Sequence, residues 1–296
     1  MTTAPASVPG RGGGKRGPLI SRWGALAVPL LVFLVIAFVL PMALMVIRSV
    51  TDPPNVGLGN YVEFFGSEAD IHVLWNTFYI AGVVTICCLL VGYPYAYLMV
   101  IVPQRVSGVL LVAVLVPFWS SLLVRTFAWE IILRDTGLIN STLKALGLIT
   151  QPLPLDRNTF AVSLGMTQIL LPFMVLPLFT VMQRIDPELT RAAANLGAPP
   201  VRAFRRVFLP LSYPGVLAGS LLVFVLALGF YITPAILGSL RETMISKFIA
   251  DQIQTRLDWG LGTAMAVILM AITLVVLLIA SRFVKLRDVY GALGEE

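Results

Sequence analysis

Six stretches of this chain contain no Asp, Glu, Lys, Arg or His, and each is long enough to cross a lipid bilayer. They are residues 23–47, 75–102, 106–124, 158–183, 207–240 and 259–281. About 20 consecutive apolar residues span the hydrocarbon core of a bilayer. The whole chain is 58% hydrophobic and 12% charged, whereas a soluble domain is roughly 25% charged. The sequence therefore predicts an all-α integral membrane protein with six transmembrane helices.

The fifth stretch is too long for one straight helix at ~1.5 Å per residue. Pro210, Pro214 and Gly238 are expected to limit this span to about residues 212–237. Within it, Gly229 followed by Pro234 predicts a local break, because proline removes one backbone hydrogen bond. Such breaks are tolerated where they face protein or a water-filled cavity. We therefore expect a gate or a substrate contact there.

The distribution of basic residues predicts the orientation. With a cytoplasmic N-terminus, thirteen Lys and Arg residues lie in cytoplasmic segments and seven outside, while Arg125 falls at the end of the third stretch. The positive-inside rule then places both termini in the cytoplasm. We expect a disordered basic tail at residues 1–22, a six-helix membrane domain at 23–284, and a cytoplasmic tail at 285–296. The first apolar stretch is too long for a signal peptide and is expected to be retained.

The longest cytoplasmic segment, residues 184–210, predicts two short helices joined at an angle. Asp186 suits an N-cap, Pro187 the first helical position, and Glu188 the positive end of the helix dipole. Gly197 is the natural residue after the C-terminus of that helix. A second, amphipathic helix is expected over residues 201–208, ending at Leu209-Pro210. This elbow has two interpretations. It is either a docking element for a partner protein or an ordinary loop that lies on lipid headgroups.

The spacing within this elbow resembles a known pattern, the E-A-A-x3-G-x9-I-x-L-P loop of ABC importer permeases. In that family the loop inserts into a groove on the ATPase subunit. Arg191 stands where the family usually has Glu, and Glu188 lies one helical turn earlier on about the same face. The resemblance thus implies a set of ATPase-coupling residues: Asp186, Glu188, Arg191, Ala192, Ala193, Gly197, Val207, Leu209 and Pro210.

Four ordered segments, residues 116–129, 137–140, 171–179 and 209–238, resemble spermidine/putrescine-type permeases. The similarity runs from about residue 76 to 284. It implies a type I ABC importer permease in a bacterial inner membrane that transports polyamines. The implied partners are ABC ATPase subunits, a second permease subunit (identical or different), a periplasmic or extracellular substrate-binding protein and membrane lipids. Related permeases leave phosphonates, opine-like compounds and metal-anion complexes open as substrates.

Catalytic motifs are lacking in the sequence. The glycine-rich segment at residues 10–17 lacks the leading Gly of a P-loop and the Ser or Thr after Lys15. We therefore expect no enzymatic activity, no metal and no cofactor, with ATP bound by a partner subunit, and no nucleic-acid binding. An ion-coupled secondary transporter is the alternative from another class, but it would need ionisable residues inside the membrane. A membrane enzyme would need a catalytic constellation.

Arg125 and Glu130 follow the third predicted span and are the candidates for charges within the membrane. A charge at the bilayer centre costs ~2.5–3.5 kcal/mol, so Arg125 either snorkels to the interface or lines a pathway. For a polyamine, Glu130 would attract and Arg125 would repel unless the two pair. Aromatic rings could add cation–π contacts. The candidate pathway residues are Trp119, Arg125, Trp129, Glu130, Gly229, Tyr231 and Pro234.

Overall fold

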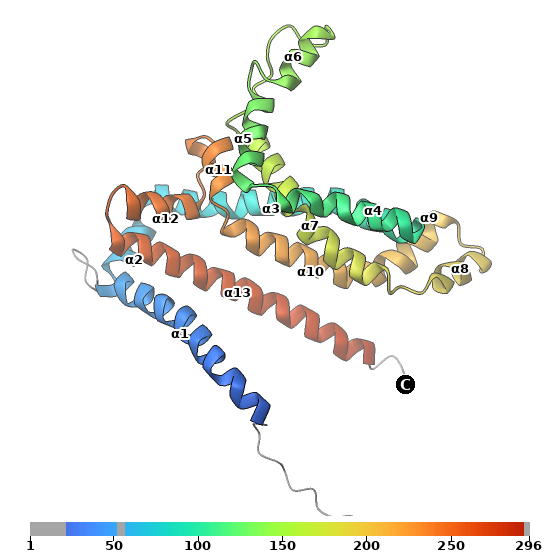
Figure 1. The fold of residues 1–296 in the computed structure, drawn as a ribbon, viewed down its shortest axis with the longest axis horizontal. Helices are drawn as coiled ribbons and strands as arrows, with labels where there is room; N and C mark the ends of the chain where they lie inside the picture. Colours follow the sequence, from blue (N-terminus) through green and yellow to red (C-terminus); the bar gives the residue numbers. More distant parts are fainter. Residues whose placement is uncertain (1–21, 52–56, 293–296) are drawn as a thin grey trace, which may run out of the picture. The chain divides into compact units, whose positions relative to one another are not determined.

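The computed structural model describes residues 22–51 and 57–292, with side chains from 28 to 51 and from 57 to 282 (Figure 1). The predicted N-terminal tail lies outside these residues except for Arg22, as does the end of the C-terminal tail. The regular structure of the described residues is all helical. Residues 1–47 and 48–296 form two separate units. Helix α1 (Arg22–Thr51) supplies the described part of the first unit, where the side chains from 28 to 47 are almost all exposed.

Three long helices form the core of the second unit: α3 (Glu68–Ile101), α7 (Thr159–Met182) and α10 (Leu209–Leu228). They lie side by side in Figure 1. Gly215 and Gly219 of α10 let its backbone approach α7, in the small-xxx-small spacing that favours close packing of membrane helices. Met174 of α7 is fully buried between Gly219 and Gly92 of α3. This core depends on glycines as much as on large apolar side chains.

A smaller cluster joins the elements at one end of this unit. Helix α13 (Trp259–Ala292) packs against α2 (Gly59–Gly66) and α12 (Ile245–Gln254) through Phe64, Ile245 and Met265. Helices α2 and α12 also contact α3. The cluster therefore joins the last span to the rest of the second unit.

The third predicted span is broken rather than continuous. Helix α4 (Gln104–Leu115) and the 3₁₀ turn η1 (Val116–Trp119) are followed, after a bend of 96°, by α5 (Leu122–Leu133) and α6 (Leu138–Ala145). Ser120 and Ser121 are extended at the bend, with ψ of 149° and 134°, directly after the proline-containing turn. Figure 1 shows α5 and α6 directed away from α3, α7 and α10. The described residues thus hold five helices able to span a membrane, or six if the bent pair is one span.

The fifth predicted span also differs in detail. Helices α9 (Pro200–Ala203), η2 (Phe204–Phe208) and α10 are continuous, so the expected helix end at Leu209-Pro210 is wrong. The η2 segment is a π-helix in which the Leu209 N–H donates to the Phe204 carbonyl. This wider turn makes room for the Pro210 ring. The expected break is confirmed, because α10 ends at Leu228 and α11 (Ile232–Leu237) begins after Gly229–Tyr231.

Candidate functional site

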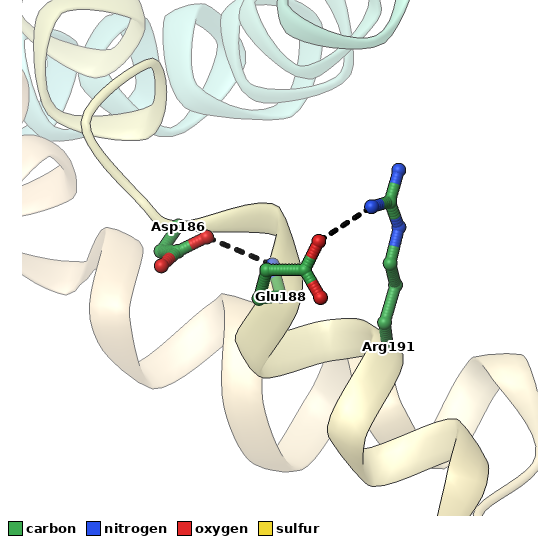
Figure 2. A network of polar contacts seen from close by, with 3 residues as sticks. All are labelled: Asp186, Glu188 and Arg191. Atoms are coloured by element: carbon green, nitrogen blue, oxygen red, sulfur yellow. Dashed lines mark hydrogen bonds and ion pairs between the residues drawn. The ribbon is translucent and has the colours of Figure 1, made fainter.

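The elbow begins with a well-capped helix, α8 (Pro187–Asn195), shown in Figure 2. The Asp186 carboxylate accepts a hydrogen bond from the Glu188 N–H at 2.9 Å. Pro187 occupies the first turn, where its missing N–H costs nothing. The start of the elbow therefore follows the sequence expectation residue by residue.

Gly197 ends this helix in a left-handed conformation, with φ of 86°. Its N–H donates to the Ala194 carbonyl at 2.9 Å, and the Ala198 N–H donates to the Ala193 carbonyl at 3.0 Å. These two bonds form a Schellman motif, which satisfies carbonyls that the helix end would leave free. The sharp turn of the elbow thus requires a residue that tolerates positive φ.

Glu188 and Arg191 pair along α8, as Figure 2 shows. Arg191 Nη1 lies 2.5 Å from Glu188 Oε1, and both side chains are about 70% exposed. Glu188 and Arg191, which stands where the E-A-A pattern has Glu, are therefore exposed together and available to the same partner. Ala192 is exposed beside them and Ala193 is half-buried.

Aromatic packing holds the second part of the elbow against α3. Tyr97 lies 5.3 Å from Phe204 and 5.0 Å from Phe208 between ring centroids. Val207 is half-buried, while Leu209 and Pro210 are exposed. The amphipathic character inferred from the sequence is confirmed at Phe204 and Phe208, whereas Val201 is exposed. The aromatic partner on α3 was not anticipated. A cavity of about 560 Å³, bordered by Tyr97, Arg191 and Phe204, lies between the end of α3 and helix α8.

A second cavity, of about 390 Å³, lies at the bend between η1 and α5. Arg125 and Ser120 are its polar lining residues, among aromatic and aliphatic side chains from η1, α5, α7 and the end of α10. The Arg125 Nε is buried and has no hydrogen-bond partner among the residues that the structure describes. Phe230, from the break after α10, also lines this cavity. The two interrupted spans therefore border one space that contains a cationic side chain.

The other pathway candidates are dispersed. Glu130 pairs with Arg134 at 2.6 Å, one turn away, and not with Arg125. Trp129 Nε1 donates to Gln168 Oε1 of α7 at 2.8 Å, which ties α5 to the core. Trp119 is 81% exposed. Of the sequence candidates, Arg125 alone lines the cavity.

The break in the fifth span connects to the broken third span. Thr126 of α5 and Thr233 of α11 are fully buried, with their hydroxyl oxygens 3.4 Å apart. Pro234 is buried beside them, whereas Tyr231 is 41% exposed. Gly229 caps the end of α10.

The cavity contains residues that sequence reasoning missed, namely Phe118, Ser120 and Phe173. One local sequence signal could have revealed the bend that forms this cavity. A proline followed by a Ser-Ser pair inside an apolar run is a recognised cause of helix interruption. Without it, the third stretch reads as an unbroken span.

Curated relatives cover most of the chain. It is 33% identical over 224 residues to the "Spermidine/putrescine transport system permease protein PotB" of Haemophilus influenzae, covering 75% of this chain and 78% of that protein. It is 34% identical over 198 residues to the "Inner membrane ABC transporter permease protein YdcU" of Escherichia coli, covering 62% and 63%. No family model matches the chain.

Solved structures share the fold. A chain of a bacterial alginate ABC transporter, crystallised with an alginate pentasaccharide-bound periplasmic protein, superposes with a TM-score of 0.69. The superposition covers 86% of this chain and 91% of that one, at 18% sequence identity. The superposition supports the helical arrangement, and at such low identity it carries no information on the substrate.

Proposed function

Since this chain belongs to the ABC transporter permease family, we propose that it forms one half of an inner-membrane pathway for polyamines such as spermidine and putrescine. The chain is a membrane subunit of a binding-protein-dependent ABC importer. Its role is transport, with no ATPase activity or cofactor of its own. The observation that carries the polyamine proposal is the 33% sequence identity to PotB over 75% of this chain.

The substrate proposal is tested with the cognate receptor and with transport. We expect the purified substrate-binding protein to bind spermidine and putrescine, and proteoliposomes with the complete transporter to accumulate labelled putrescine only when ATP is supplied. Uptake by this chain without an ATPase would favour the secondary-transporter alternative. A receptor that ignores both polyamines would refute the substrate while leaving the family unaffected.

Arg125 favours a second candidate substrate class. A guanidinium with a buried, unpartnered Nε beside a mainly apolar cavity suits an anionic group such as a carboxylate or phosphonate. No acidic side chain lines the described cavity to attract an ammonium group. Opine-like compounds and phosphonates therefore form the alternative.

Two variants separate these substrate classes. If the pathway carries polyamines, Arg125→Gln keeps or increases putrescine uptake, because a repelling charge is removed. If it carries anions, Arg125→Gln abolishes uptake of the anion and Arg125→Lys retains part of it. Both variants need an insertion check by surface labelling, which reports folding independently of the substrate.

The elbow, residues 184–210, is the proposed site of ATPase docking. Its support is the E-A-A-like spacing together with the exposed, capped α8 and the turn at Gly197. The contact set comprises Asp186, Glu188, Arg191, Ala192, Ala193, Gly197, Val207, Leu209 and Pro210. In this proposal, closure of the ATPase dimer moves the elbow and drives alternating access between this chain and a second permease.

The excess of basic residues supports an orientation with both termini cytoplasmic, as thirteen against seven on the two sides indicates. This arrangement puts the elbow on the side where ATP is available. It leaves the loops at 52–74 and 241–258 to face the receptor. The proposed domain division is a tail at 1–22, the membrane domain at 23–284 and a tail at 285–296.

A further inference from the structure

Three arginines stand at the start of the long helix that becomes α10. Arg202, Arg205 and Arg206 are exposed, and together with Pro199 and Val201 they border a surface hollow of about 530 Å³. None of the three has an ion-pair partner among the described residues. The opposite face of the same segment is fixed to α3 by Phe204 and Phe208. The arginines are therefore held in place with their charges unneutralised.

The depth of these arginines in the membrane follows from the length of α10. Its 20 residues extend ~30 Å, the thickness of the hydrocarbon core. Arg206 precedes Leu209 by ~5 Å along the helix and Arg202 by ~10 Å, measured by the same rise. The headgroup layer adds roughly 5–8 Å on each side of the core. Arg205 and Arg206 therefore lie at the level of the phospholipid phosphates, and Arg202 lies about one helical turn further out, at the aqueous edge of the headgroup layer.

One face of the helix continues inward from the arginines. Arg206, Tyr213, Leu217 and Phe224 follow at spacings of seven, four and seven residues, which keeps them on about the same side of a helix. Tyr213 is exposed, and Leu217 and Phe224 are half-buried. An apolar path thus leads from the charged hollow toward the membrane interior.

That path ends in a groove between α3, α10 and α13. The groove has a volume of about 510 Å³ and an almost wholly apolar lining that includes Leu217, Ala218 and Ile279. A Cβ added at Gly82, on its α3 side, would meet no atom within 4 Å. Leu217 lies ~12 Å inward from Leu209, within the ~15 Å depth of one leaflet. An acyl chain that starts at the headgroup level reaches the near end of this groove.

We propose that the arginine hollow and the groove form one binding site for an anionic phospholipid. Its phosphate is held by Arg202, Arg205 and Arg206, and one acyl chain lies along Tyr213 and enters the groove beside Leu217. Charge complementarity at headgroup depth and the continuous apolar face favour a lipid over a helix as occupant. The site lies in the second part of the elbow, so the lipid would stabilise the π-helical segment that leads into α10.

Native mass spectrometry of the full chain, delipidated in detergent, tests the charged half of the site. The probes are dioleoyl phosphatidylglycerol, dioleoyl phosphatidylcholine and glycerol phosphate. We expect phosphatidylglycerol to bind best, each Arg→Gln change to weaken it about fivefold and the triple change about 100-fold. Arg105→Gln, an exposed arginine on α4 outside the hollow, is the matched control and should have no effect.

The apolar half is tested separately. Ala218→Phe fills the groove. It should weaken the binding of both phosphatidylglycerol and phosphatidylcholine without changing the preference between their headgroups. A photocrosslinker at position 217, activated in native membranes, should yield an adduct of lipid mass. Equal binding by the triple variant, glycerol phosphate binding as tightly as phosphatidylglycerol, or crosslinks to residues 28–47 or to another subunit would each overturn the proposal.

Discussion

Met174 of α7 occupies the space that a side chain at Gly219 of α10 would need. A Cβ added at Gly219 would lie 2.8 Å from the Met174 Sδ and 3.1 Å from its carbonyl oxygen. Both residues lie in the core where α3, α7 and α10 pack together. The distance between these helices is therefore set by the absence of a side chain at Gly219.

Gly219→Ala should destabilise the protein by about 1–3 kcal/mol, as overpacking of a dense core does. Thermal unfolding of the purified chain in detergent measures this loss. Gly108→Ala in α4 is the control, because a Cβ there meets nothing within 4 Å and alanine favours helix. Equal melting temperatures for Gly219→Ala and the native chain would contradict the close helix approach.

Gly197→Asp should leave the protein inserted in the membrane but abolish transport by uncoupling the ATPase. The matched variant is Gly197→Asn, because Asn and Asp tolerate the left-handed conformation similarly and differ in charge. We expect Gly197→Asn to keep most of the transport. ATP hydrolysis and uptake, measured together in proteoliposomes, distinguish uncoupling from misfolding. Transport at the native rate by Gly197→Asp would show that the elbow does not dock as proposed.

Glu188→Gln should weaken assembly with the ATPase, because removing one partner of an interface charge pair costs about 2–5 kcal/mol. The chain's own stability should change by less than about 1 kcal/mol, since the ion pair with Arg191 is exposed. Arg191→Glu, combined with Glu188→Gln, returns the acid to its usual position in the family pattern and should restore assembly. Co-purification of the ATPase measures these effects. Undiminished assembly of the Glu188→Gln variant would mean that this acid makes no contact with the ATPase.

Gln168→Leu should destabilise the chain by about 0.6–2 kcal/mol, the range for hydrogen bonds between membrane helices. The change leaves the Trp129 indole N–H without its acceptor. Adding Trp129→Phe removes the stranded donor, so the double variant should lose less than the two single losses combined. Strictly additive losses in thermal unfolding would argue that this hydrogen bond contributes nothing.

The number of spans could be predicted from the sequence because the hydrocarbon core of a bilayer excludes charged residues. Each span can therefore be recognised from its own residues, without knowing which helices it packs against. Capping at Asp186 and Gly197 was equally predictable, since caps depend on neighbouring residues only. The contact between Met174 and Gly219 could not be predicted, because it depends on which helices pack together. The pairing of Glu130 with Arg134 rather than Arg125 follows the i,i+4 spacing along α5, because Arg125 lies five residues from Glu130. The 96° bend before α5 could not be predicted, because the third apolar run contains no charged residue to mark it.

The buried contact between Thr126 and Thr233 constrains how the two interrupted spans can move. Each threonine lies beyond a break in its span, at residues 120–121 and 229–231. Helices α5 and α11, which follow the two breaks, are therefore expected to move together. A rotation about the serine pair displaces α11 as well as α5, so a pull on either span changes the cavity from two walls at once.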